Sequence, residues 1–375
     1  MAVGPHGRSI LTKYRGDKMF DINFIQKTMD IKKDIINGQY SFNSNNDIFQ
    51  IFEKFRANTP YIFNIETTNN CNMSCVMCPR TKLMNRKITL LNDSSFDKLV
   101  NQITFHSKKD LLGFFNFVES EYGITKEEQS ENAFYFYVIS QALVLHGYGE
   151  PLLDPNIHKR IQSCSDRNIP TYFSCVPANI RHKQICQLFE SGLDYIKFAI
   201  DALDDQGQKA IRGKNNNFQK SFDSIIELIK YKDMNPNINT QIIITMLSFA
   251  ENEDQIEQFI KLWSQYPVYY YIKSTDNRWY YQNSKRTKNR SHYISQYCEF
   301  PWTSLTVMSN GIVVPCTQDY NAEMVMGNIF DNSLEEIWNS KSYKDLRQYH
   351  INGNFPDGYK CKKRCDLPKV FERLA

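Results

Sequence analysis

The sequence lacks the features that would place this chain in a membrane, outside the cell or on nucleic acid. No window approaches the ~18 consecutive apolar residues that span a bilayer. The first twenty residues are basic and carry no apolar core of a secretory signal. A net charge of +4 over 375 residues permits an anionic ligand and does not demand nucleic acid. We therefore expect a cytoplasmic protein that binds neither membrane nor nucleic acid.

The composition does not support a disordered chain either. Charged residues make up 23% of the chain and hydrophobic residues 41%, which is an ordinary globular composition. The length allows two or three domains, or one large barrel with an appendage. A core of that size needs no disulfides, and thiols stay reduced in the cytosol. Clustered cysteines therefore indicate a metal site or catalysis.

The ten cysteines fall into two groups and three single residues. The early group has the spacing C-x3-C-x2-C, and the late group has four members in the last quarter of the chain. Four thiolates are enough for a closed metal site, whereas three need an outside ligand. The two groups are Cys71, Cys75 and Cys78, and Cys298, Cys316, Cys361 and Cys365.

The early cysteines directly follow a predicted strand. The segment 61–67, YIFNIET, alternates apolar and polar residues and is bounded by Pro60 and Asn69. A loop at the carboxyl end of a strand is where (β/α) barrels place their chemistry. Both a zinc site and an iron–sulfur cluster use thiolate ligands, so the chemistry is open at this point.

This segment resembles the CxxxCxxC signature of the radical S-adenosylmethionine (SAM) enzymes. The resemblance implies that Cys71, Cys75 and Cys78 hold a [4Fe–4S] cluster. In that family the open iron is chelated by the amino and carboxylate groups of the methionine moiety of SAM. A three-cysteine zinc knuckle is the alternative interpretation.

A second segment, LVLHGYGEPLLDP, is similar to the GGEP motif of the same family, which receives the amino group of SAM. An apolar run ends in glycines, which permit a close backbone approach. Tyr148 replaces the first glycine of the family's pair, and we tolerate that change because the backbone carbonyl does the binding. The implied cofactor-binding residues are Gly147, Tyr148, Gly149 and Glu150. The alternative is a plain strand and turn with an exposed glutamate.

The resemblance assigns three more residues to the cofactor. Ser174, near the end of a predicted strand, matches a position where the family often places a hydroxyl on the ribose, and Asn179 lies just beyond it. Arg212 would lie near the methionine carboxylate, with which a guanidinium pairs bidentately. The alternative for Arg212 is a surface arginine before a loop.

Cys175 is a candidate catalytic residue. It follows Ser174 at the strand's carboxyl end, where we expect it to face the cavity and to serve as a hydrogen-atom donor to a substrate radical. A buried structural thiol is the alternative. Cys164 and Cys186 fall on predicted helices and are expected to pack as small hydrophobic residues.

The predicted strands alternate with helices, which indicates parallel βαβ units. Six such units predict an α/β fold, the partial (β/α)6 TIM-like barrel of the family, over residues 60–282. Residues 1–59 form a helical extension, and residues 107–132 a helical insertion. The predicted strands are 61–67, 142–146, 170–175, 195–200, 240–246 and 267–272; the predicted helices are 94–104, 156–167, 181–191, 218–231 and 252–264.

The last domain, 283–375, is expected to be small. Ser309, Asn310 and Gly311 lie between two apolar runs, which indicates a hairpin followed by an amphipathic helix. The segment resembles the SPASM/twitch extension of radical SAM enzymes. Its four cysteines imply one auxiliary [4Fe–4S] cluster, although Cys361 and Cys365 have the spacing C-x3-C where C-x2-C is usual. A structural zinc site is the alternative.

Three functions follow from these residues. The resemblance implies reductive cleavage of SAM to a 5′-deoxyadenosyl radical, with electrons from a donor such as flavodoxin or ferredoxin. We expect hydrogen abstraction from a small polar substrate of the sugar, aminocyclitol or nucleotide type, giving oxidation or epimerisation. A peptide or protein maturase of the same superfamily is the second hypothesis, and a non-catalytic zinc protein is the third.

Overall fold

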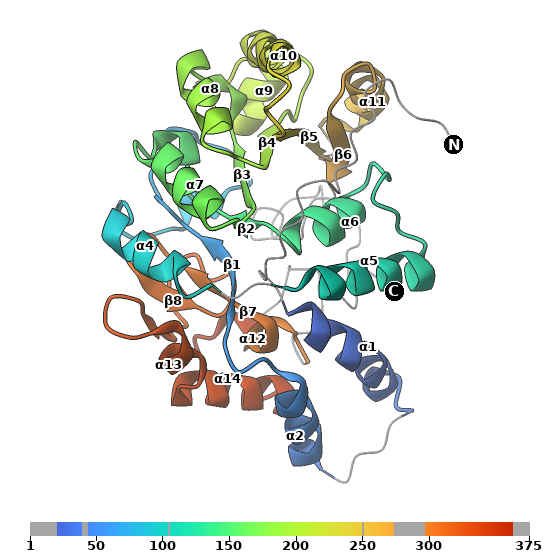
Figure 1. Cartoon of the computed structure of the whole chain (residues 1–375), viewed down its shortest axis with the longest axis vertical. Coiled ribbons are helices and arrows are strands. Elements are labelled where there is room, and N and C mark those ends of the chain that lie inside the picture. The colour runs from blue at the N-terminus through green and yellow to red at the C-terminus, as the bar shows by residue number, and fades with distance from the viewer. Residues whose placement is uncertain (1–20, 40–43, 104–105, 250, 274–296, 363–375) are drawn as a thin grey trace.

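The computed structural model describes residues 21–39, 44–103, 106–249, 251–273 and 297–362. Its centre is a nine-stranded sheet in the order β6-β5-β4-β3-β2-β1-β7-β8-β9, which stays open between its two edges (Figure 1). The six strands of the barrel are parallel and lie at the predicted places. They are β1 (Tyr61–Ile65), β2 (Leu143–Val144), β3 (Thr171–Cys175), β4 (Tyr195–Ala199), β5 (Gln241–Leu247) and β6 (Tyr269–Lys273).

Helices cover the outer side of these strands (Figure 1). They are α4 (Asp93–Val100), α7 (Ile157–Asp166), α8 (His182–Glu190), α9 (Asp205–Arg212), α10 (Phe218–Met234) and α11 (Ile256–Trp263). Five of them lie at the predicted helices, although α4 ends four residues earlier and α11 begins four residues later than predicted, and α9 has no predicted bounds. The fold is therefore the predicted open (β/α) barrel.

The two faces of the sheet bury different side chains, because successive residues of a strand point to opposite sides. Phe173 and Ile196 pack in the large core cluster between the strands and the outer helices. Tyr172 and Tyr195 pack on the other side, which we call the inner face. Aromatic residues dominate that inner face. It is covered by α6 (Glu131–Phe134) and the following π-helix η2 (Tyr135–Ile139).

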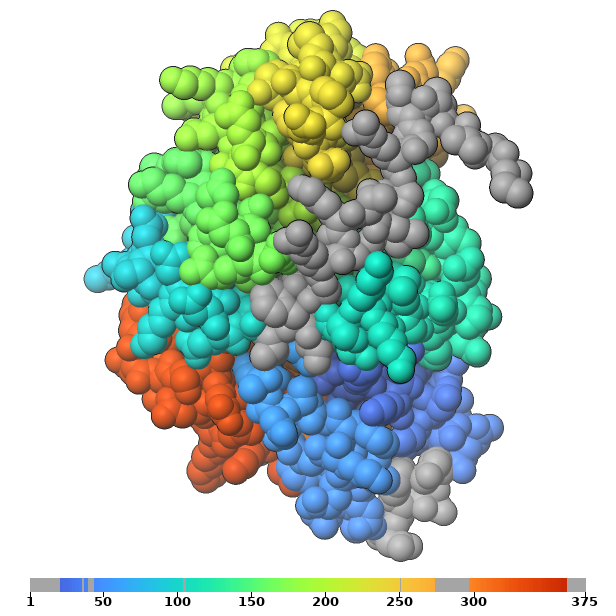
Figure 2. Space-filling view, viewed as in Figure 1, coloured from blue at the N-terminus to red at the C-terminus, as the bar shows by residue number. Residues whose placement is uncertain are grey.

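The predicted insertion forms α5 (Lys108–Tyr122), which a capping box of Ser107 and Asp110 begins and Gly123, at φ 66°, ends. It packs against α1 (Ile22–Ile36), and α1 in turn packs against α2 (Asn45–Phe55). The space-filling view shows the blue elements at one end of the molecule, with the orange-red C-terminal elements on one side of them and the teal α5 on the other (Figure 2). The boundaries 59/60 and 282/283 stay predictions, and the second lies outside the described residues.

The C-terminal region continues the barrel sheet. Its first strand β7 pairs in parallel with β1, and the predicted hairpin joins β7 to β8 through Gly311 at φ 80°. The small domain therefore shares its sheet with the barrel. Its elements are α12 (Phe300–Thr303), β7 (Ser304–Val307), β8 (Ile312–Val314), β9 (Gly327–Asn328), α13 (Leu334–Trp338) and α14 (Lys341–Asn352).

The N-terminal helices are held to this region by aromatic packing. The ring of Trp302 in α12 lies 6.0 Å from that of Phe24 and 5.4 Å from that of Phe52, and all three side chains are buried. Such pairs add to the stabilisation from burial. Short turns complete the described structure: α3 (Pro79–Lys82), η3 (Pro151–Leu153), η4 (Pro177–Asn179), η5 (Glu253–Gln255) and η6 (Lys360–Lys362). None of the described helices has the length and hydropathy to cross a bilayer.

Candidate active site

The early cysteines lie in the loop that follows β1, and their side chains meet in one small apolar cluster. Cys75 is buried in this cluster with Met73 and Val176, and Cys71 and Cys78 pack against it. Burial raises the pKa of Cys71 to about 11 and that of Cys78 to about 12. Thiols in such surroundings stay protonated until a metal displaces the proton.

The donor chemistry fits an iron–sulfur cluster. In the described part of the chain, no three His, Cys, Asp or Glu side chains lie as close together as the ligands of one metal ion. A cubane places each thiolate on a different iron. Cys71, Cys75 and Cys78 are the residues that would hold it, and their loop is fastened by Thr81, whose hydroxyl donates to the Cys75 carbonyl at 2.9 Å.

Glu150 lies directly beside this loop. Its backbone N–H donates to the Asn70 carbonyl at 2.7 Å, and its carboxylate is only 2% exposed. The carboxylate accepts from the backbone N–H groups of Leu152 at 3.2 Å and Val176 at 3.0 Å. Burial raises its pKa to about 7. The alternative of an exposed glutamate is therefore wrong, whereas binding of the cofactor by Glu150 stays a prediction.

The two glycines before Glu150 bring the turn after β2 against the end of β1. A Cβ on Gly147 would lie 2.7 Å from the Glu66 carboxylate, and one on Gly149 would lie 2.0 Å from the Thr68 carbonyl. Both positions therefore need glycine for close backbone approach. Tyr148 between them points toward the C-terminal region, where its hydroxyl donates to the Thr317 carbonyl at 2.6 Å.

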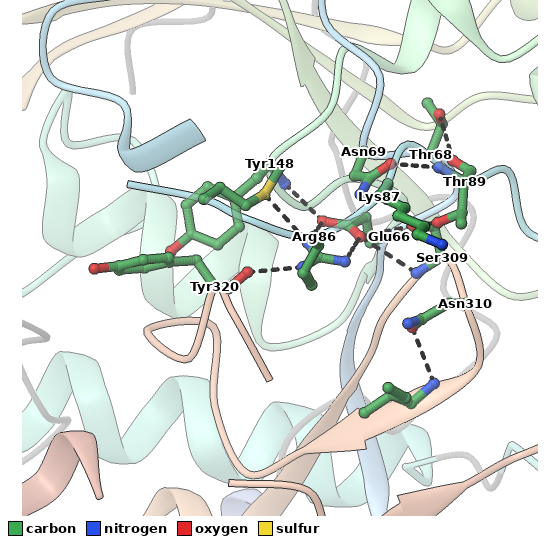
Figure 3. A network of polar contacts seen from close by, with 12 residues as sticks. Glu66, Thr68, Asn69, Arg86, Lys87, Thr89, Tyr148, Ser309, Asn310 and Tyr320 are labelled. Carbon is green, nitrogen blue, oxygen red and sulfur yellow. Dashed lines mark hydrogen bonds and ion pairs between the residues drawn. The ribbon is translucent and has the colours of Figure 1, made fainter. Parts of the chain in front are cut away.

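A buried polar network, missed by the sequence analysis, surrounds this turn (Figure 3). Arg86 forms a bidentate ion pair with Glu66, with both N–O distances at 2.8 Å and side chains 7% and 3% exposed. Glu66 also accepts from the Tyr148 backbone N–H at 3.1 Å and from the Ser309 hydroxyl at 2.9 Å. Arg86 donates to the Tyr320 carbonyl at 2.7 Å. The sequence signal for this network is Glu66, which directly follows β1.

Two more predicted residues also meet the cysteine loop. Asn179 and Asn72 join their amides by two hydrogen bonds of 2.8 and 3.0 Å. Arg212 pairs with Asp201 at 2.5 Å, and the Cys75 thiol donates to its carbonyl at 3.7 Å. Arg212 is therefore no isolated surface arginine. That these two residues bind the cofactor stays a prediction.

Ser174 lies on the inner face, where its backbone N–H donates to Nδ1 of His146 at 3.3 Å. Burial and two nearby lysines lower the pKa of His146 to about 3, so its imidazole is neutral. The neighbouring strand places Lys197 opposite Ser174. His146 and Lys197 were missed from the sequence, although a polar residue in the alternating strand YIKFA was a usable signal. The ribose contact of Ser174 stays a prediction.

The expectation that Cys175 faces the cavity is wrong. Its thiol is 3% exposed and packs in the core cluster between the sheet and the outer helices. Neighbouring residues of a strand point to opposite sides, so Ser174 and Cys175 cannot both face inward. Cys175 has the surroundings of a buried structural thiol, which was the alternative.

The late cysteines occupy two places. Cys298 and Cys316 pack on one cluster with α1, α5 and Phe300, whereas Cys361 packs against the large core. Cys365 lies outside the described residues. Phe63 of β1 packs both against the cluster of Cys298 and Cys316 and against the inner-face cluster. Phe63 therefore links these two clusters, and its ring lies 5.4 Å from that of Phe300.

Comparisons with known families agree with this architecture. The Radical SAM superfamily matches residues 65–262, which is more than half of the chain. An iron–sulfur cluster-binding domain, SPASM, matches residues 298–366. The chain belongs to the radical SAM superfamily and carries a C-terminal SPASM domain. These two domains imply SAM and iron–sulfur clusters as its cofactors.

Individual relatives are more distant. The chain is 32% identical over 65 residues to the SAM-dependent 2-deoxy-scyllo-inosamine dehydrogenase of Niallia circulans. That match spans 17% of this chain and only 26% of the relative. The crystal structure of Streptococcus suis SuiB bound to SAM has a TM-score of 0.52 at 13% identity, over 94% of this chain and 82% of SuiB. The structure of BtrN in complex with AdoMet and 2-DOIA has a TM-score of 0.46 at 16% identity, over 82% and 94% of the two chains.

Proposed function

We propose that this radical SAM enzyme removes hydrogen from a small polar substrate, such as a sugar, an aminocyclitol or a nucleotide, and oxidises it. The observation that carries this proposal is the position of the inner face relative to the two cysteine groups. Phe63 packs against it and against the cluster of Cys298 and Cys316, while the loop of Cys71, Cys75 and Cys78 lies at the end of the same strand. A substrate on that face would lie between the two cysteine groups.

The residues of the first group have separate roles in this proposal. Cys71, Cys75 and Cys78 would hold the cluster. Glu150 would receive the amino group of SAM, and Arg212 its carboxylate. Bound there, the cluster and SAM supply the radical that abstracts hydrogen. The glycine turn allows the backbone to approach the cofactor, and the buried network around Glu66 keeps that turn in place.

The second group accounts for the direction of the reaction. We assign Cys298, Cys316, Cys361 and Cys365 to one auxiliary cluster, as their number and order suggest. Oxidation of the substrate needs an acceptor for one further electron, and a cluster held by these cysteines would supply it. The segment that carries Cys361 contacts the loop after Cys316, because Lys360 forms an ion pair with Glu323 at 3.1 Å. The dehydrogenase activity of the Niallia circulans relative also supports oxidation.

The test is anaerobic reconstitution in deuterated water with polyol and aminocyclitol candidates, read by mass spectrometry. A product lighter by two hydrogens, formed together with 5′-deoxyadenosine, would support the proposal. Deuterium incorporation without mass loss would mark an epimerase instead. Absence of 5′-deoxyadenosine from protein with a full iron content would contradict the proposal as a whole.

A peptide maturase is the second candidate. The similarity to SuiB over 94% of the chain favours it as a fold likeness only. None of the described residues forms a separate peptide-binding domain ahead of the barrel, since α1 and α2 pack onto α5 and the C-terminal elements. Turnover of a precursor peptide without turnover of any small polyol would favour this candidate.

A further inference from the structure

Lys197 is a lysine of the inner face that has no carboxylate partner among the described residues. Its Nζ lies 5.0 Å from the ring centre of Phe134, 5.8 Å from that of Tyr172 and 5.9 Å from that of Tyr271. The hydrogen bond found for it is a long one, 3.4 Å to the hydroxyl of Tyr271. Among the described residues, no carboxylate lies within 4.0 Å of this nitrogen. The side chain is half-buried, so it keeps some access from outside.

The other charged groups around Lys197 are already paired. Lys273 of β6 lies 3.9 Å from Glu131 of α6, and Arg212 lies 2.5 Å from Asp201. These four groups all act electrostatically on Lys197, and the neutral His146 lies on the same face. Counted over the part of the chain that the structure describes, the two ion pairs cancel, so protonated Lys197 leaves one uncompensated positive charge. The pKa of Lys197 is lowered to about 7, mainly by burial and in second place by the positive charge of the nearby Lys273.

The surrounding rings do not complete this site. Ring faces attract a cation, but an ammonium group has three N–H donors that seek oxygen acceptors. The Tyr271 hydroxyl accounts for one donor at most. A partly buried charge with a single long hydrogen bond is poorly compensated, whereas an anion would form charge-assisted hydrogen bonds with it.

We propose that the substrate carries an anionic group, a carboxylate or a phosphate, and that this group binds Lys197. This inference rests on the proposed function, because it takes the inner face as the substrate site. The position fits, since Arg212 contacts the cysteine loop through Cys75 and also acts electrostatically on Lys197. It narrows the substrate class to acidic sugars, sugar phosphates and similar molecules, and it disfavours a free aminocyclitol, whose ammonium group Lys197 would repel.

The experiment is a binding comparison with the reconstituted holoenzyme in the presence of SAM. The probes are glucuronate, glucose 6-phosphate, glucose and glucosamine, measured by anaerobic calorimetry at millimolar concentration. The two anionic probes should bind at least about tenfold more tightly than the neutral and cationic ones. Lys197→Met should abolish that preference, and Lys197→Arg should keep it. Lys183→Met, at an exposed lysine of α8, is the matched control.

The pH dependence gives a second readout. Anion binding needs protonated Lys197, which is lost as pH rises through its lowered pKa of about 7. Affinity for glucuronate should therefore fall by about tenfold between pH 6 and pH 8 in the wild type. It should stay flat in Lys197→Arg, because a guanidinium remains charged throughout. The phosphate group of glucose 6-phosphate itself titrates in this pH range, whereas the carboxylate of glucuronate stays ionised. Glucuronate therefore gives the decisive comparison.

Four outcomes of the probe-binding comparison would overturn this inference. They are equal binding of all four probes, no detectable binding of any probe, preference for glucosamine, and an unchanged anion preference in Lys197→Met. Loss of SAM binding in Lys197→Met would also overturn it, by assigning the lysine to the cofactor. None of these outcomes affects the formation of 5′-deoxyadenosine by the wild type, so the proposed function would still stand. Turnover of 2-deoxy-scyllo-inosamine would refute the anion and support the proposed function.

Discussion

The two cysteine regions of this molecule are built in different ways. Cys71, Cys75 and Cys78 lie in one short loop, and the strand that precedes them and the helix that follows are both local. Cys298, Cys316 and Cys361 are separated by a hairpin, strand β9 and three α-helices, and they pack in two different clusters. The first region is therefore close to complete in its own segment, whereas the second depends on the rest of the fold.

The two regions are nevertheless joined through Glu66 and its partners. Glu66, at the end of the strand before the first cysteines, binds Arg86, Tyr148 and Ser309, and Ser309 belongs to the C-terminal hairpin (Figure 3). The first cysteine group is local in sequence, but the glycine turn beside it, Gly147 to Gly149, is held by contacts from distant segments. The following substitutions test how far each region depends on the other.

Loss of a first-group cysteine should have the largest effect. Cys75→Ala should reduce 5′-deoxyadenosine formation below detection and remove about four irons per chain, because a cubane held by two thiolates is not retained. Chromatography of the nucleoside and iron analysis would measure both. Cys298→Ala should leave 5′-deoxyadenosine formation in place and stop net oxidation. Cys186→Ala, a half-buried thiol on α8, is the control; retained turnover in Cys75→Ala would refute the cluster assignment.

Breaking the buried ion pair should be the next largest effect. Arg86→Met leaves the Glu66 carboxylate buried without its partner, which costs about 3–5 kcal/mol in the free energy of unfolding. Urea denaturation of the apoprotein would measure it. Lys341→Ala removes one member of an exposed pair with Asp345 and should leave the denaturation midpoint unchanged. Equal midpoints for Arg86→Met and Lys341→Ala would show that the junction contributes no stability.

A side chain in the glycine turn should cost less. Gly149→Ala places a Cβ against the Thr68 carbonyl, and relieving that contact costs about 1–3 kcal/mol of unfolding free energy and displaces Glu150. SAM affinity should fall with it, measured by equilibrium dialysis. Gly113→Ala in α5 meets nothing within 4 Å and should instead raise stability by about 0.5–1 kcal/mol. Full SAM affinity in Gly149→Ala would argue against this turn as the cofactor site.

The smallest effect should come from the tyrosine that replaces a family glycine. Tyr148→Phe removes the hydrogen bond to the Thr317 carbonyl, worth about 0.5–1.5 kcal/mol. Its backbone is unchanged, so SAM affinity should also be unchanged. Thermal denaturation and dialysis would separate the two. A drop in SAM affinity with unchanged stability would mean that the hydroxyl, and not the backbone, serves the cofactor.

Local patterns predict most of the barrel. The alternation in YIFNIET marks β1, and the cysteine spacing directly after it indicates the family. The same alternation, applied to β3, places Cys175 on the outer side. The prediction that it faces inward is wrong because a position at the end of a strand does not decide the face, which follows from the residue's parity along the strand.

Contacts between distant segments are the part that could not be predicted. Nothing in a single sequence pairs Glu66 with Arg86, Tyr148 with Thr317, or Lys197 with three rings from different elements. Such partners are chosen by strand order and register, which depend on the whole chain. The auxiliary ligand set is the same kind of problem, and with Cys365 outside the described residues its completeness stays a prediction.

The sequence by itself determined the cofactor class, the number of βα units and the turn that needs glycine, because each of these is written in a short stretch of neighbouring residues. Only the tertiary structure decided that the C-terminal hairpin adds to the barrel sheet beside β1. It also decided which side chains share the inner face and which aromatic rings surround Lys197 there. The physical reason is that hydrogen-bonded strand pairing brings together residues far apart in the chain, and the environment of a charge depends on those neighbours.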